Sequence, residues 1–118
     1  MTSNMTANNA IARKLDAIRT KGAMQSVDVA NLLGLRPETV SRWNQGKAFP
    51  RPGAEQTLLA LEYIVDELSD FYEPADARLW LYSPQKLLSG ARPADLIQAG
   101  DTQRVIEIIE QLRDGVYL

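Results

Sequence analysis

The fold of this chain is constrained most by the spacing of its apolar residues, which recur every three or four positions almost throughout. That spacing places them along one side of an α-helix, whereas the alternation of apolar and polar residues that is typical of strands is nearly absent. Glycine and proline residues divide the pattern into segments of different lengths. The sequence therefore predicts an all-α fold.

A stretch rich in proline and glycine, residues 47–53, separates two groups of expected helices, and a chain of 118 residues forms one domain or two very small ones. We expect a helix-turn-helix domain over residues 9–52, preceded by a disordered segment at 1–8. Residues 53–118 are expected to form a long helix and a small helical domain. The helical pattern covers residues 9–19, 26–34, 37–44, 54–72, 75–82, 84–90, 93–100 and 101–114.

Three prolines are expected to start helices. Pro37, Pro84 and Pro93 each stand just before a helical segment. The first helical position tolerates proline because its N–H group has no partner within the helix. Ser83 is the expected N-cap of the brief helix that begins at Pro84.

The composition excludes several classes of function. The chain has neither cysteine nor histidine, so it has no disulfide, no thiolate or imidazole metal ligand and no histidine general base. It has no run of about 18 apolar residues that would span a membrane, and MTSNMTANNA lacks the apolar segment of a secretory signal. We expect a cytoplasmic protein that engages no membrane, holds no cofactor or metal, and is not an enzyme.

The net charge of −2 hides a difference between the two halves. Residues 1–56 hold eight basic and four acidic residues, whereas residues 57–118 hold five basic and eleven acidic ones. The first half is therefore suited to a polyanion and the second is not. Chance asymmetry in an acidic protein is the alternative explanation.

The stretch SVDVANLLGLRPETVSRWNQG, residues 26–46, carries a specific pattern of small and apolar residues. Ala30 is small where two helices must approach each other, and Gly34 stands where a tight turn requires a positive φ. Val40 and Trp43 are the apolar residues that would hold the second helix against the first. This spacing resembles the helix-turn-helix of the Xre/Cro repressor family, and it places Trp43 in the core.

The resemblance implies that the second helix of this motif enters the major groove of DNA. Arg42 is then the candidate for a bidentate contact to guanine, and Gln45 for one to adenine. Glu38 would meet phosphates unfavourably unless it accepts from a cytosine amino group. The predicted DNA-binding residues are those that point away from the apolar stripe or lie near phosphates: Arg36, Glu38, Thr39, Ser41, Arg42, Gln45, Lys47 and Arg51. The alternative is a unit that has kept the fold and lost DNA binding.

The C-terminal half shows no pairing of carboxylates with a nucleophile, and physical reasoning alone predicts a small helical interaction domain. Its order of residues resembles the toxin-binding domain of the Xre-type antitoxins that neutralise RES-domain toxins, in particular the mycobacterial antitoxin of this class. The resemblance lies in an aromatic-rich helix, a Ser-Pro step, a Leu-Leu pair and a Pro-x-Asp-Leu step between glycines. These features are Trp80, Ser83, Pro84, Leu87, Leu88, Gly90, Pro93, Asp95, Leu96, Gly100, Val105 and Gly115.

The resemblance implies a protein partner. RES toxins degrade NAD by phosphorolysis or hydrolysis, and their antitoxins block the NAD pocket and often repress their own operon. We therefore expect a RES-domain toxin and operator DNA as partners, and a homodimer within a larger hetero-oligomer. A stand-alone transcription regulator, whose acidic half dimerises or senses a ligand, is the alternative function.

Two sets of residues are candidates for toxin binding. Leu87, Leu88 and Ile97 would bind if they are exposed, since excess apolar surface marks a partner site. Trp80 and Tyr82 are expected in the core. The C-terminal candidates are Asp114, Gly115, Val116, Tyr117 and Leu118, which offer an aromatic ring, apolar side chains and carboxylates to the pocket. The alternative is that the last three of these cover the chain's own core.

Overall fold

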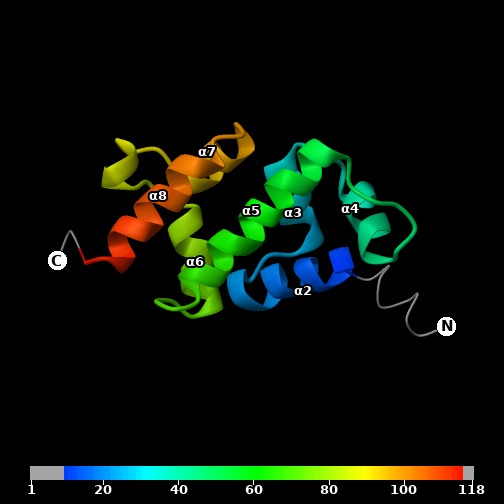
Figure 1. Cartoon of the computed structure of the whole chain (residues 1–118), viewed down its shortest axis with the longest axis horizontal. Helices are drawn as coiled ribbons and strands as arrows, with labels where there is room; N and C mark the ends of the chain where they lie inside the picture. The colour runs from blue at the N-terminus through cyan, green and yellow to red at the C-terminus, as the bar shows by residue number, and fades with distance from the viewer. Residues whose placement is uncertain (1–9, 116–118) are drawn as a thin grey trace.

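The computed structural model describes residues 10–115, and the regular structure within this range is entirely helical (Figure 1). This confirms the predicted all-α fold. Residues 1–9 and 116–118 lie outside the described range. The prediction that residues 1–8 are disordered therefore concerns residues that the structure does not describe. The elements are α2 (Ala10–Gly22), α3 (Ser26–Leu33), α4 (Pro37–Asn44), α5 (Pro52–Leu68), α6 (Pro74–Leu81), the 3-10 helix η1 (Lys86–Leu88), α7 (Pro93–Gln98) and α8 (Thr102–Arg113).

Proline and glycine set several of the helix boundaries. Pro37 and Pro93 occupy the first turn of α4 and α7, as predicted. Gly34 ends α3 with a φ of 71°, in the left-handed region that glycine adopts without steric cost. The next amide, that of Leu35, donates to the carbonyl oxygen of Ala30 at 2.8 Å, which satisfies an acceptor left free at the helix end.

Two expected boundaries were wrong. The long helix ends at Leu68 rather than at residue 72. After it, the amides of Asp70 and Phe71 donate to carbonyls only three residues back, those of Glu67 and Leu68, at 3.2 and 2.9 Å, and form a tight turn. Ser83 does not cap a helix that begins at Pro84. Its hydroxyl donates to the Leu79 carbonyl at 2.6 Å, so Ser83 closes α6, and only the short η1 follows.

Helix α5 lies at the centre of the fold, and both α2 and α8 pack against it (Figure 1). Its inward side chains Leu58, Leu61, Ile64 and Leu68 are completely buried. Burial of one such side chain contributes about 1.5–3 kcal/mol relative to exposure. The first helix of the C-terminal group therefore shares one core with the N-terminal group.

No helix between residues 10 and 115 has both the length and the apolar character that crossing a bilayer requires.

Candidate functional site

Two regions at opposite ends of the long axis of the molecule carry the predicted site residues. Helix α4 lies at one end, and the C-terminal end of α8 lies near the other (Figure 1).

Helices α3 and α4 are held together by the residues that the motif singled out. Val29, Ala30, Val40 and Trp43 are all buried, with exposed fractions between 0 and 3%. The prediction that Trp43 lies in the core is confirmed. The side chains that pack α4 lie on its inner side, so its outer side is available for contacts with a partner.

The predicted DNA-binding residues all keep some contact with solvent. Thr39 and Ser41 are half-buried, and the other members are exposed. Four of the exposed residues are basic, and none of them makes an ion pair or a side-chain hydrogen bond with any residue in the described range: Arg36, Arg42, Lys47 and Arg51. Their charges remain available for a polyanion.

An apolar groove lies in the C-terminal half, between α6, η1 and the end of α8. Its volume is about 420 Å³. Helix α6 contributes Trp80, and α8 contributes Ile108 and Leu112, which are one helical turn apart. The groove is lined by Tyr72, Trp80, Pro84, Gln85, Lys86, Leu87, Ile108 and Leu112.

Two large apolar side chains that are next in sequence to groove residues are exposed. Leu79 is 64% exposed and Phe71 is 43% exposed. Leu79 lines a second hollow together with Tyr72 and Trp80, which also line the groove. The groove and Leu79 thus form one continuous apolar surface of the kind that marks a partner site.

The sequence pattern did not single out Leu79 or Tyr72 as contact residues. One signal was present, however. Leu79, Trp80 and Leu81 are consecutive, and three consecutive residues spread over about 200° of a helix surface. A short helix cannot bury that arc on one side, so one of the three had to face outward. Leu81 is completely buried, and Leu79 is the residue that faces solvent.

The expectation for the Leu-Leu pair and Ile97 needs correction. Leu87 lines the groove, but Leu88 and Ile97 are only 2% and 1% exposed. Both belong to the core because η1 and α7 direct these side chains inward, toward α8. They therefore offer almost no surface to a partner. Trp80 is buried as expected, and Tyr82 is half-buried.

The C-terminal candidates are only partly described. Asp114 is exposed, and Gly115 follows it with a φ of 71°. Val116, Tyr117 and Leu118 lie outside the described residues.

Polar contacts join α3 to the C-terminal half. Arg78 of α6 forms an ion pair with Asp28 of α3 at 2.9 Å, and its guanidinium lies 5.0 Å from the centre of the Tyr82 ring. The hydrogen bond to Asp28 raises the pKa of Arg78. Gln98 of α7 donates from Nε2 to the Asn31 carbonyl of α3 at 3.0 Å. These contacts fix the orientation of the C-terminal half, which carries the groove, relative to α3, which packs against α4.

Metal binding has no support from the described residues, because residues 10–115 contain no group of three potential metal ligands.

Comparison with known proteins gives consistent results. Residues 60–115 match the model of the antitoxin Xre/MbcA/ParS C-terminal toxin-binding domain. The chain is 33% identical to the mycobacterial cidal antitoxin MbcA of Mycobacterium tuberculosis over 91 residues, which are 77% of this chain and 80% of that protein. It is also 33% identical to a probable mycobacterial cidal antitoxin of M. tuberculosis, over 88% of each chain.

A solved structure extends the likeness to three dimensions. One chain in the crystal structure of the M. tuberculosis MbcT–MbcA toxin–antitoxin complex superposes with a TM-score of 0.80 at 32% identity, over 93% of this chain and 99% of that chain.

Proposed function

This chain belongs to the Xre/MbcA/ParS antitoxin family, and we propose that it binds a RES-domain toxin and blocks the toxin's NAD pocket. The observation that carries this proposal is the apolar groove. All of its lining residues lie between Tyr72 and Leu112 in the sequence, within the segment that matches the toxin-binding domain. A domain of this size exposes a continuous apolar surface only at some cost in solubility, and a partner protein that covers the surface offsets that cost.

In the proposed complex, the groove and the exposed side chain of Leu79 bury apolar surface against the toxin. Val116, Tyr117 and Leu118 enter the NAD pocket, where an aromatic ring substitutes for a flat ring of the cofactor. Burial of Tyr117 and Leu118 would contribute roughly 1.5–3 kcal/mol each before the cost of ordering them. The acidic charge of residues 57–118 suits a basic pocket rim and speeds encounter. The chain acts by obstruction and performs no catalytic step.

We also propose that α4 binds operator DNA and that the complex represses its own operon. Four basic residues next to and on α4, which make no ion pair with any residue between 10 and 115, support this role, because phosphate contacts dominate the affinity of proteins for DNA. One such unit offers few contacts, so a dimer that reads two half-sites is required. The outer side of α5 is the proposed dimer contact, since Leu59 and Tyr63 there are 41% and 43% exposed.

Co-expression with the adjacent gene tests the toxin-binding proposal. The gene product should deplete cellular NAD when expressed alone, and co-expression of this chain should prevent the loss. Purification should yield a stable complex of the two proteins. A chain without Tyr117 and Leu118 should fold normally but protect NAD poorly. Unchanged protection by the shortened chain would refute the entry of these residues into the pocket. A lone homodimer that binds DNA and no toxin would favour a stand-alone regulator instead.

A further inference from the structure

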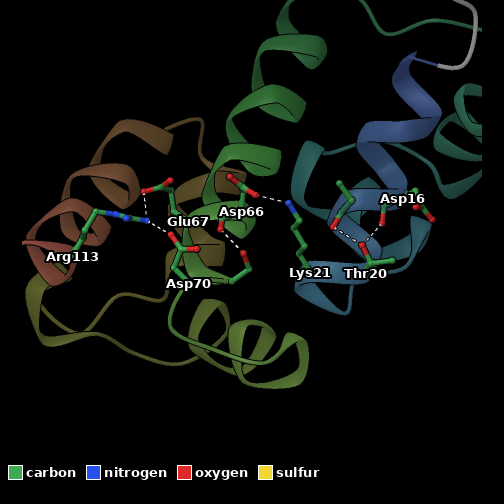
Figure 2. Close-up of polar contacts among 9 residues, drawn as sticks. Asp16, Thr20, Lys21, Asp66, Glu67, Asp70 and Arg113 are labelled. Atoms are coloured by element: carbon green, nitrogen blue, oxygen red, sulfur yellow. Dashed lines mark hydrogen bonds and ion pairs between the residues drawn. The ribbon is translucent and has the colours of Figure 1, made fainter. Parts of the chain in front are cut away.

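The carboxyl end of α5 concentrates acidic side chains (Figure 2). Asp66 and Glu67 lie in the last turn of α5, and Asp70 follows two residues after its end at Leu68. A helix C-terminus carries partial negative charge, so carboxylates are locally unfavourable there. We therefore expect these carboxylates to form ion pairs with basic side chains from other helices.

Each of these carboxylates has a partner from a distant part of the chain. Lys21 of α2 pairs with Asp66. Arg113 of α8 pairs with both Glu67 and Asp70, because its Nη2 atom lies 2.8 Å from Glu67 Oε1 and 2.6 Å from Asp70 Oδ2 (Figure 2). The end of α5 is thus the point to which the C-terminus of α8 is tied.

The Arg113 contact is more than an isolated surface ion pair. Two carboxylates converge on one guanidinium, and the guanidinium carbon lies 5.6 Å from the centre of the Phe71 ring. The side chain of Glu67 is only 18% exposed. The hydrogen bond to Asp70 raises the pKa of Arg113. Several charges in a network constrain geometry better than single exposed pairs, which contribute little.

Arg113 stands where α8 gives way to the predicted toxin-binding residues. It is the last residue of α8 and follows Leu112 of the groove. Asp114 and Gly115 come next, and the Gly115 amide donates to the Leu112 carbonyl at 3.2 Å. Helix ends fray unless tertiary contacts hold them. The contacts of Arg113 therefore fix the turn from which residues 116–118 depart.

We propose that Arg113 is a positioning residue for toxin binding, which fixes the departure point of Val116, Tyr117 and Leu118 by tying the last turn of α8 to α5. The proposal rests on the proposed entry of these residues into the toxin. Without the tie, the last turn samples several orientations, and binding must select one of them. Such a loss of preorganisation lowers affinity without removing any contact to the partner.

A double-mutant cycle tests this role. The affinity for the proposed RES-domain toxin, the product of the adjacent gene, is measured for four chains: the full chain, Arg113→Gln, the chain cut after Gly115, and the cut chain with Arg113→Gln. Arg113→Gln should weaken binding by about tenfold in the full chain and by less than about twofold in the cut chain, because residues that act as one unit are not additive. A structural role would weaken both chains equally.

Two further variants separate charge from geometry. Arg104→Gln removes the same charge from the same helix, at an exposed residue that has no ion pair with any residue between 10 and 115. It should leave toxin affinity within about twofold of the full chain. Arg113→Lys keeps the charge but lacks the planar guanidinium that lies over the Phe71 ring, so it should fall between wild type and Arg113→Gln.

The outcomes separate the positioning role from the proposed function. If cutting after Gly115 weakens binding but Arg113→Gln does not, or if the two effects add, the positioning role is refuted and the proposed function stands. If the cut itself has no effect on affinity, the proposed entry of residues 116–118 fails, and the role of Arg113 fails with it. An equal effect of Arg104→Gln and Arg113→Gln would assign the loss to net charge and overturn the proposal.

Discussion

At the α4 end of the molecule, Arg36, Arg42, Lys47 and Arg51 make no ion pair with any residue between 10 and 115. At the α8 end, Arg113 binds two carboxylates. The same type of side chain thus has different tasks in the two regions. A basic side chain without an ion pair can attract a charged partner, whereas an ion-paired side chain such as Arg113 holds one helix against another.

Apolar surface shows the opposite distribution. On α3 and after α4, Val27 and Phe49 are exposed but line none of the described hollows of the surface. In the C-terminal half, Leu79 continues an apolar groove. We expect binding at the first region to depend strongly on salt and binding at the second to depend on buried apolar area. The following changes test this division.

Leu79→Asp should have the largest effect. It places a carboxylate on the proposed apolar contact, where burial without a partner is costly. Toxin affinity should fall on the order of 100-fold, which is the size expected for a hot-spot residue of an interface. The free energy of unfolding should change by less than about 0.5 kcal/mol, because Leu79 is exposed in the free protein. Isothermal titration calorimetry and thermal unfolding measure the two quantities.

Val27→Asp is the matched control for this prediction. Val27 lies on α3 and is 47% exposed, so the substitution adds the same charge at a similar exposure, outside the groove. It should leave toxin affinity within about twofold of wild type. Equal losses in the two variants would show that the added charge, and not the groove, determines the effect.

Gly22→Ala tests whether both regions depend on one core. A Cβ atom at residue 22 would lie 2.8 Å from Val65 Cγ1, and a buried β-branched side chain has little freedom to move. Overpacking of this kind costs about 1–3 kcal/mol, which should lower Tm by roughly 4–8 °C per kcal/mol. A single unfolding transition is expected, followed by near-ultraviolet circular dichroism and calorimetry. Separate transitions for the two halves would contradict a shared core.

The control for Gly22→Ala is the same change away from close packing. Gly53 has no atom within 4 Å of an added Cβ atom and no positive φ. Gly53→Ala should therefore leave stability unchanged or raise it by up to about 1 kcal/mol.

The local features of the fold could be predicted from the sequence. Apolar periodicity located the helices, and the motif of Ala30, Gly34, Val40 and Trp43 placed each of these residues in its observed environment. These features depend on neighbours a few positions apart, which the sequence displays directly. The exposure of Arg42 followed from the same register.

The candidate groove could not be predicted in the same way. Which of several apolar residues faces outward in η1 and α7 depends on how these short elements pack against α8. Leu88 and Ile97, which were candidates for toxin binding on the condition that they are exposed, lie in the core. The ion pair between Arg113 and Glu67 joins residues that are far apart in the sequence, and no spacing rule predicts such a contact. Tertiary contacts decide these features, and a single sequence does not show them.

Arg42→Ala should have a smaller effect than the previous changes. A bidentate contact to guanine discriminates against the wrong base by about 1–3 kcal/mol, so the preference for the operator over a mismatched site should fall by about tenfold. Arg42→Lys keeps the charge but not the planar fork, and it should lose preference while retaining most affinity. Fluorescence anisotropy with matched and mismatched duplexes measures both. If both variants keep the wild-type preference, α4 is not the recognition helix.

Lys47→Ala should have the smallest effect, and it probes the electrostatic character of the α4 region directly. Loss of one phosphate contact should weaken binding a few-fold for all duplexes and reduce the slope of log K against log salt by about 0.9. Lys86→Ala is the matched control, because Lys86 is also an exposed lysine without an ion pair in the described range, but it lies at the groove. The slope should be unchanged in that variant. Equal slopes for wild type and Lys47→Ala would show that this unpaired charge does not face DNA, and the division between the two regions would then have to rest on Arg36, Arg42 and Arg51 alone.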